Sequence, residues 1–372
     1  MDETSADSDV EVLIQLGRAL ISKILEGEPM TSVQKLVEDG APLWYQDDED
    51  GSSPLHAAAY LQSEELVKYL LEQGAVWNAV DNLKHTAGEI ALSYNNEKIY
   101  TLIRDHGLRS ELLLGLLSSK SDLENRSDSL VLSNTDQTAA ASTEAFLTSR
   151  LTFTTDDQGQ EICVVRAGDD DVGVMMTWEQ GIMEYTAKLL LEGHTNSKAL
   201  RVLNVGHGLG VIDNLFQASS TPPMLHCIVE PHPDVLRRMK EQGWYDRPGV
   251  KIIEGKWQDA IEELNSFGGF DVVYTDTFSE DYNQLREFFE LLPDLLSGPE
   301  SRFGFFNGLG ATNLIFYDVY TRLSELHLAE VGVDVEWHDV PVDEGDSRWG
   351  GTRQYFALPI YRLPVGRMGN FA

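Results

Sequence analysis

The stretch Asn204-Val205-Gly206-His207-Gly208-Leu209-Gly210-Val211-Ile212 decides the fold of the larger part of this chain. It follows the short β-branched run Arg201–Val205 and precedes a helix-like segment, so its glycines lie where a strand turns into a helix. Glycine lets the backbone turn sharply out of a strand and approach a ligand closely at the carboxyl end of a parallel sheet. We therefore expect a ligand-binding loop here.

The spacing of the glycines narrows the kind of ligand. The nicotinamide fingerprint has its third glycine one residue after Gly210, where this chain has Val211. Gly206, Gly208 and Gly210 instead form G-x-G-x-G, the spacing of S-adenosylmethionine methyltransferases, whose cofactor has no pyrophosphate to accommodate. The loop therefore favours S-adenosyl-L-methionine.

The region from Phe146 onward alternates short β-branched runs with helix-like stretches. The runs that we interpret as strands are Arg201–Val205, His226–Val229, Lys251–Ile253, Val272–Thr275 and Phe303–Phe306. This alternation predicts a Rossmann-like α/β domain with a parallel sheet and right-handed crossovers. Two later runs, Asp334–Trp337 and Tyr355–Ile360, are expected to form an antiparallel pair at the sheet edge.

Acidic residues end two of these strands. Glu230 ends the second, where a carboxylate can accept hydrogen bonds from both ribose hydroxyls of a nucleoside, unless it is simply an exposed carboxylate. Asp276 ends the fourth strand, which faces the sulfonium in such sites, so its position makes it a catalytic candidate. Residues 255–259 follow the third strand and are expected near the adenine, with Trp257 either there or in the core.

The first third of the chain repeats itself. Gly40, Gly74 and Gly107 each follow a helix-like apolar stretch, at intervals of 34 and 33 residues. Ser53-Pro54-Leu55-His56-Ala57-Ala58 and the degenerate Thr86-Ala87-Gly88-Glu89-Ile90-Ala91 are likewise 33 residues apart. A period of about 33 with a T-P-L-H-x-A-like element is the ankyrin signature. A plain small helical bundle is the alternative interpretation.

These patterns divide the chain into three parts. We expect an all-α ankyrin-repeat module over residues 1–117 and a Rossmann-like domain over residues 146–372. Residues 118–145 are rich in Ser, Asp, Asn and Thr, which predicts a linker with one helical turn near Leu130–Leu132.

Composition excludes several classes of protein. Lys and Arg number 28 against 61 Asp and Glu, a formal net charge of −33, which argues against binding a nucleic-acid backbone. Cys163 and Cys227 are the only cysteines, too few for a disulfide framework, and no cluster has metal-site spacing. The acidic N-terminus is unlike a targeting peptide, and no run of about 18 apolar residues predicts a membrane helix.

Several motifs in order resemble those of guanidinoacetate methyltransferase. The similar segments are Val174–Met183, Val202–Gly210, Ile228–His232, Gly255–Asp259, Asp271–Phe278 and Arg353–Pro359. With ankyrin-like repeats in front, the chain resembles the fungal protein arginine N-methyltransferase 2 family, type IV enzymes that methylate the internal (δ) guanidino nitrogen of protein-bound arginine. Gly308-Leu309-Gly310 replaces a more polar stretch of the small-molecule enzyme, which is consistent with a peptide acceptor. The paired-glutamate and Thr-His-Trp loops of the common protein arginine methyltransferases are absent from the sequence.

The resemblance implies a set of site residues. Glu179 and Asp276 would bind the guanidinium, although Glu179 could instead cap its own helix. Residues that would hold S-adenosyl-L-methionine are Phe153, Met183, Gly206, His207, Gly208, Leu209, Gly210, Val211, Glu230, Pro231, His232, Gly255, Lys256 and Asp276. The side chain of His207 is expected to point away from the ligand. The resemblance also implies a monomer in the cytoplasm and nucleus, with a basic protein substrate and a protein partner for the repeats, and with no nucleic acid, membrane or metal.

Two carboxylates suit chemistry at a guanidinium, which has a pKa above about 12 and no free lone pair. They can bind its N–H groups, orient one nitrogen and accept the proton that leaves. A small-molecule guanidino methyltransferase and a non-catalytic ankyrin adaptor with a relic cofactor domain are the alternatives. The repeats argue against the first, and the joint presence of Glu179, Glu230 and Asp276 argues against the second. The net charge of −33 would attract a basic acceptor protein.

Overall fold

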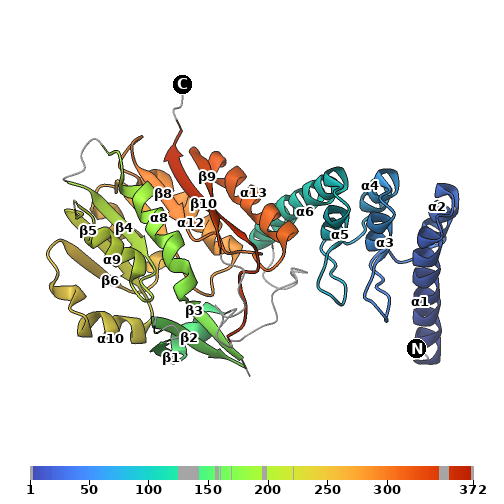
Figure 1. The fold of residues 1–372 in the computed structure, drawn as a ribbon, viewed down its shortest axis with the longest axis horizontal. Helices are drawn as coiled ribbons and strands as arrows, with labels where there is room; N and C mark the ends of the chain where they lie inside the picture. The colour runs from blue at the N-terminus through green and yellow to red at the C-terminus, as the bar shows by residue number, and fades with distance from the viewer. Residues whose placement is uncertain are drawn as a thin grey trace. The chain divides into compact units, whose positions relative to one another are not determined.

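The computed structural model describes residues 3–124, 142–155, 159, 161–168, 170–194, 199–220, 222–342 and 352–369. The chain forms two compact units, one of residues 1–131 with 313–323 and the other of residues 132–312 with 324–372 (Figure 1). Most of the predicted linker, with the turn expected near Leu130–Leu132, lies outside the described residues.

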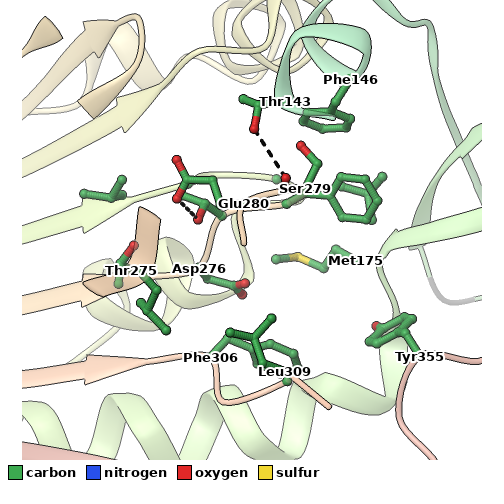
Figure 2. A pocket seen from close by; sticks show the side chains of 18 of the residues that line it. Thr143, Phe146, Met175, Thr275, Asp276, Ser279, Glu280, Phe306, Leu309 and Tyr355 are labelled. Atoms are coloured by element: carbon green, nitrogen blue, oxygen red, sulfur yellow. Dashed lines mark hydrogen bonds between the residues drawn. The ribbon is translucent and has the colours of Figure 1, made fainter. Parts of the chain in front are cut away.

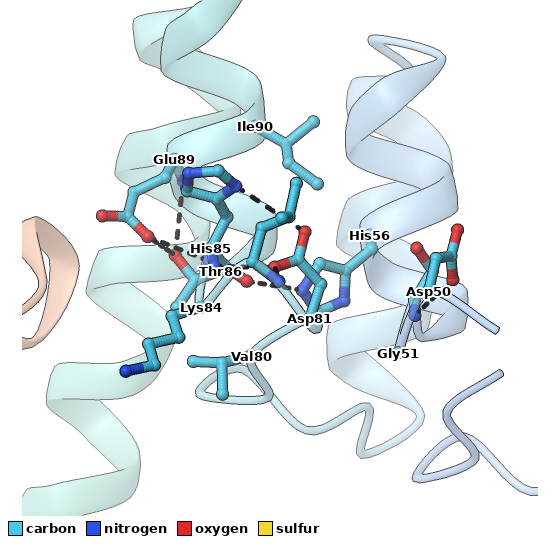
Figure 3. Close-up of polar contacts among 12 residues, drawn as sticks. Asp50, Gly51, His56, Val80, Asp81, Lys84, His85, Thr86, Glu89 and Ile90 are labelled. Carbon is cyan, nitrogen blue, oxygen red and sulfur yellow. Dashed lines mark hydrogen bonds and ion pairs between the residues drawn. The ribbon is translucent and has the colours of Figure 1, made fainter. Parts of the chain in front are cut away.

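The first unit is helical, as the repeats predict. Its helices are α1 (Glu3–Leu25), α2 (Met30–Glu38), α3 (Pro54–Tyr60), α4 (Glu64–Glu72), α5 (Ala87–Ser93) and α6 (Glu97–Glu124). Ser53 and Thr86 are the N-cap residues of α3 and α5, and each side-chain oxygen accepts a hydrogen bond from the backbone N–H three residues on. The ring of His56 then contacts the carbonyl oxygen of His85 at 3.1 Å and so links successive repeats (Figure 3).

A segment from much later in the chain completes this unit. Helix α13 (Leu314–Glu330) begins in it, and Ile315 and Val319 are fully buried in the core of the repeats. The amide of Asn313 donates to the Glu89 carboxylate at 2.5 Å, and the same carboxylate caps α5. Residues 313–323 of the predicted Rossmann-like region therefore pack with the repeats.

The second unit is built on a twisted sheet with the strand order β6-β5-β4-β7-β8-β10-β9. Its strands are β4 (Arg201–Val205), β5 (Leu225–Glu230), β6 (Val250–Glu254), β7 (Val272–Thr275), β8 (Arg302–Phe305), β9 (Val333–Pro341) and β10 (Ile360–Met368). The five strands predicted to be parallel pair in parallel. Helices of this unit are α7 (Thr143–Thr148), α8 (Gln180–Leu191), α9 (Val211–Gln217), α10 (Pro233–Glu241), α11 (Ile261–Ser266), α12 (Tyr282–Leu295) and the rest of α13. The predicted Rossmann-like α/β architecture is confirmed.

The last predicted strand is a correction. An antiparallel pair closes the sheet edge as expected, but the strand predicted at Tyr355–Ile360 instead begins at Ile360 and runs to Met368. This strand contains Pro364, and proline cannot donate to a strand ladder. In the structure Pro364 lies opposite Trp337 of β9, while β8 pairs only with Gly366 and Arg367. Pro364 therefore lies outside the ladder between β8 and β10.

A small antiparallel sheet precedes the large one and was not predicted. It consists of β1 (Leu151–Thr155), β2 (Glu161–Ala167) and β3 (Asp170–Met175), in that order. Apolar side chains of this sheet, such as Cys163 and Val165, pack in one core with Met175 and Leu209. This sheet places Met175 beside the glycine loop.

Candidate functional site

A cavity of about 460 Å³ lies at the carboxyl ends of the parallel strands (Figure 2). Each parallel strand contributes residues from the loop that follows it. The lining includes Gly206 and Gly208 after β4, Glu230 and Pro231 at the end of β5, Lys256 and Trp257 after β6, Asp276 to Asp281 after β7, and Phe306 with Gly308 to Thr312 after β8. This is the edge at which open α/β sheets bind ligands.

The glycine loop needs glycine for close packing. Gly206 has φ +95°, and a Cβ atom there would lie 2.0 Å from the carbonyl oxygen of Asp276. Gly208 has φ +53°, and a Cβ atom there would lie 3.1 Å from Cε of Met175. The two glycines thus expose bare backbone to the cavity and let the loop pack against the end of β7.

Glu230 ties the end of β5 to the glycine loop. Its buried carboxylate accepts hydrogen bonds from the backbone N–H groups of His207 at 2.8 Å, Gly208 at 3.4 Å and His232 at 2.7 Å. Burial raises the pKa of Glu230, and these N–H groups oppose that rise by stabilising the charged form. Glu230 is therefore a buried acceptor that also lines the cavity.

Glu179 reaches the cavity from the turn before α8. Its carboxylate accepts a hydrogen bond from the hydroxyl of Tyr355 and another from the backbone N–H of Met176 at 3.3 Å. Burial and the nearby charge of Asp276 raise the pKa of Glu179 to about 8. The Glu179 side chain makes no capping hydrogen bond to α8, and its bond to the N–H of Met176 lies at the start of the 3-10 turn Thr177–Glu179.

Asp276 lies at the tip of β7, the position from which the sequence made it a catalytic candidate. Its backbone N–H bonds to the carbonyl oxygen of Val205 at 2.9 Å, which fixes the residue beside the glycine loop. Figure 2 shows its carboxylate pointing into the cavity between Met175 and the pair Phe306 and Leu309. Burial raises the pKa of Asp276 to about 7. Glu179 and Asp276 thus line one cavity, and each holds its proton more tightly than an ordinary carboxyl.

The remaining predicted residues divide into two groups. Among the described residues, Pro231 and Lys256 line the cavity with those named above. Residues outside the lining are Phe153, Met183, His207, Leu209, Gly210, Val211, His232 and Gly255. Met183 is buried and accepts from the hydroxyl of Tyr274 at 3.4 Å, and the Phe153 ring lies 4.6 Å from the guanidinium of Arg238.

Sequence reasoning missed several residues of the cavity wall. Phe146 on α7 and Met175 on β3 come from segments whose structure was not predicted. Tyr355 was inside a segment matched by resemblance, but nothing in the sequence pointed to its contact with Glu179.

Glu280 was also missed, and it anchors the wall after β7. It accepts hydrogen bonds from the indole of Trp257 at 2.9 Å and the hydroxyl of Thr277 at 2.5 Å. Both partners line the cavity with Glu280, so this carboxylate joins the loops that follow β6 and β7.

No group of three or more His, Cys, Asp and Glu side chains within the described ranges could hold a metal ion. None of the helices over those same residues combines the length and apolar character needed to cross a membrane.

The fold and the site define a Rossmann-like methyltransferase-type α/β protein with ankyrin repeats. A family model of ankyrin repeats, in three copies, matches residues 20–111. Over 99% of both chains, this chain is 39% identical to protein arginine N-methyltransferase 2 of Cryptococcus neoformans. The proteins of that name from Aspergillus fumigatus and Saccharomyces cerevisiae are 37% and 32% identical, over 88% and 84% of this chain and 90% and 82% of theirs. The chain belongs to the protein arginine N-methyltransferase 2 family and is a transferase.

Among solved structures, a spermidine synthase from Thermotoga maritima is 15% identical and aligns with a TM-score of 0.38. The alignment covers 59% of this chain and 73% of that one.

Proposed function

We propose that the protein transfers a methyl group from S-adenosyl-L-methionine to the internal (δ) guanidino nitrogen of arginine in a basic protein. The observation that carries the proposal is the pairing of Glu179 and Asp276 in the cavity that the glycine loop lines. The family relationship supports arginine as the acceptor. The choice of the δ nitrogen as the acceptor rests on the motifs that resemble those of the type IV enzymes.

The residues of the cavity fit S-adenosylmethionine. Gly206 and Gly208 present backbone where a side chain would collide with Asp276 or crowd Met175. Glu230 offers a buried carboxylate at the end of β5, suited to ribose hydroxyls. When bound, this cofactor supplies an electrophilic methyl group attached to a sulfonium sulfur. Once the methyl group has been transferred, the rest of the cofactor is a neutral thioether.

The two carboxylates supply what the acceptor needs. A guanidinium between Glu179 and Asp276 would lower the pKa of both, because an opposite charge nearby favours the ionised form. The ionised pair would hold the N–H groups of the guanidinium by charge-assisted hydrogen bonds and orient one nitrogen toward the methyl group. As the new C–N bond forms, one carboxylate accepts the proton that this nitrogen loses.

Features of the cavity wall support a protein-bound acceptor over a small guanidino acid. Phe306, Leu309 and Tyr355 give the wall near Asp276 an apolar character suited to the methylene chain of arginine (Figure 2).

We also propose that the repeats bind a protein partner and that the enzyme acts as a monomer in the cytoplasm and nucleus.

The choice of acceptor is tested by a direct comparison. We would measure methyl transfer from labelled S-adenosylmethionine to an arginine-rich ribosomal-protein acceptor and to guanidinoacetate, using the full chain. The proposal predicts label in the protein and turnover of guanidinoacetate at least tenfold lower. Equal or faster methylation of guanidinoacetate, or label only in lysine, would contradict it.

A further inference from the structure

A buried carboxylate lies behind the glycine loop, outside the cavity lining. Asp213, in the first turn of α9, is completely buried. Its Oδ2 atom accepts from Nδ1 of His207 at 2.7 Å and from the amide of Asn204 at 2.8 Å, and its Oδ1 atom contacts Nε2 of His226 at 2.8 Å. These partners come from β4, the glycine loop and β5, so one side chain joins the three segments that shape this end of the sheet.

The hydrogen-bond partners in this cluster determine which of its atoms carry protons. Burial by itself raises the pKa of Asp213, but the hydrogen bonds from His207 and His226 overcome that effect and lower it to about 2. An ionised carboxylate can only accept, so each histidine must present an N–H to it. The amide of Gln217 donates to Nδ1 of His226 at 2.9 Å, which leaves the proton of a neutral His226 on Nε2. The donors around the Asp213 carboxylate are therefore held in one definite arrangement.

The side chain of His207 connects this cluster to the glycine loop. A Cβ atom on Gly210 would lie 2.6 Å from Cε1 and 2.7 Å from Nε2 of the His207 ring, so the ring fills the space directly behind Gly210. The Gly210 N–H also bonds to the His207 carbonyl oxygen at 2.7 Å. The Trp244 ring also packs against the His207 ring, nearly perpendicular to it at a centroid distance of 4.9 Å. The backbone N–H of His207 is meanwhile held by Glu230 at 2.8 Å.

We propose that Asp213 and His226 are positioning residues for the glycine loop, which act through His207 to hold the turn from Gly206 to Gly210, and with it Glu230, in the shape that receives the cofactor. The inference rests on the proposed function, because it takes S-adenosylmethionine as the ligand of this loop. His207 then contributes to cofactor binding from behind the loop, through its contact with Asp213. The competing explanation is a polar cluster that stabilises the fold and has no influence on binding.

Calorimetric titration of the full chain with S-adenosylhomocysteine separates these explanations. We expect Asp213→Ala and His207→Ala each to weaken binding about tenfold. The double variant should bind no more than about twofold more weakly than either single variant, because both substitutions break the same connection. The kcat at saturating S-adenosylmethionine should change less than threefold. A matched control is His327→Ala, which removes another buried histidine of this unit, hydrogen-bonded to Tyr282 at 2.8 Å. This control should lower the melting temperature and leave the affinity unchanged.

The outcomes distinguish the inference from the function on which it rests. Wild-type protein that fails to bind S-adenosylhomocysteine would contradict the proposed function itself. Wild-type binding with folded variants of unchanged affinity, or with additive losses in the double variant, would overturn the inference alone. If the alanine variants do not fold, the wild-type protein is studied instead, by NMR spectroscopy of the imidazole nitrogen resonances. Those of His207 and His226 should shift when S-adenosylhomocysteine binds while that of His327 stays fixed, and an absence of shift at His207 would overturn the inference.

Discussion

Tyr355 and Glu179 lie 176 residues apart in the sequence and meet at the cavity wall, where the tyrosine hydroxyl donates a hydrogen bond to the carboxylate. This bond lowers the pKa of Glu179 and so opposes the larger rise that burial and Asp276 cause. Tyr355 therefore helps set the pH at which Glu179 can hold a cationic acceptor.

Replacing Tyr355 by phenylalanine should move the pH dependence of the reaction. Without the hydroxyl, the pKa of Glu179 rises above about 8, so the acid limb of the kcat/KM profile should shift to higher pH. At pH 7 we expect about a tenfold loss, which is the effect of one pKa unit on the ionised fraction. Tyr185→Phe, at an exposed position on α8, is the control and should leave the profile in place. An unshifted acid limb in Tyr355→Phe would remove this role from Tyr355.

Asp276→Asn should abolish methyl transfer, with a loss of about 100-fold or more, the effect expected of a general base. The amide cannot accept the proton or pair with the cationic acceptor. Because the side chain keeps its shape, affinity for S-adenosylhomocysteine should stay largely intact. Asp294→Asn, on the exposed face of α12, is the matched control. Activity surviving in Asp276→Asn, measured with a labelled cofactor, would show that the catalytic assignment is wrong.

Gly206→Ala should abolish cofactor binding and lower stability. The new Cβ atom would lie 2.0 Å from the Asp276 carbonyl oxygen, and the φ of +95° disfavours any side chain. Gly181→Ala is the control, since that glycine is in helix α8 and a Cβ atom there meets nothing within 4 Å. Titration with S-adenosylhomocysteine and thermal unfolding should find the Gly181 variant as stable as the wild type or slightly more so. Normal binding by Gly206→Ala would show that the loop does not contact the cofactor as described.

Glu179→Gln should stabilise the ligand-free protein at pH 8. The folded pKa of about 8 lies above the ordinary value of 4.5, so the folded state binds more protons than the unfolded state between those values. Stability from this group is thus present at low pH and is lost as the pH rises from about 4.5 to about 8. We expect the melting temperature of Glu179→Gln to exceed that of the wild type by about 2–4 °C at pH 8, the effect of 1 kcal/mol in a domain of this size. The difference should vanish near pH 4.

Glu184→Gln, at an exposed position on the same helix, should show no such pH-dependent gain. A wild-type melting temperature that stays constant from pH 5 to pH 8, with no gain in Glu179→Gln, would contradict the raised pKa of Glu179.

Salt should weaken turnover of a basic protein acceptor. A net charge of −33 attracts a positively charged chain, and ions screen that attraction over about 10 Å at 0.1 M. We expect kcat/KM for a basic ribosomal protein to fall roughly three- to tenfold between 0.05 and 0.3 M salt. The kcat should change little. If kcat/KM did not change with salt concentration, the acidic surface would serve solubility alone.

The sequence predicts most of the fold because its signals are local. The glycine spacing after Arg201–Val205 and the caps at Ser53 and Thr86 each specify a short piece of backbone, and the structure confirms those pieces. The shifted start of β10 shows the limit, because the pairing that leaves Pro364 outside the ladder with β8 is made between strands and is contained in no single segment.

The site residues that lie at the ends of strands were predictable from the sequence. Those that depend on contacts between distant parts of the chain were not. Asp276 and Glu230 end strands of the sheet, so topology alone places them at the cavity. The contact between Tyr355 and Glu179, and the cluster around Asp213, depend on side chains that meet only after the chain has folded. The packing of Ile315 and Val319 in the core of the repeats is hidden from the sequence for the same reason.

Mass spectrometry of the arginine modified by this chain identifies the nitrogen that receives the methyl group. Fragmentation distinguishes a methyl group on the internal nitrogen from one on a terminal nitrogen of the guanidino group. We predict δ-N-methylarginine in a basic protein acceptor with the wild type and none with Asp276→Asn. Methylation confined to a terminal nitrogen, or equal product from Asp276→Asn, would contradict the proposal.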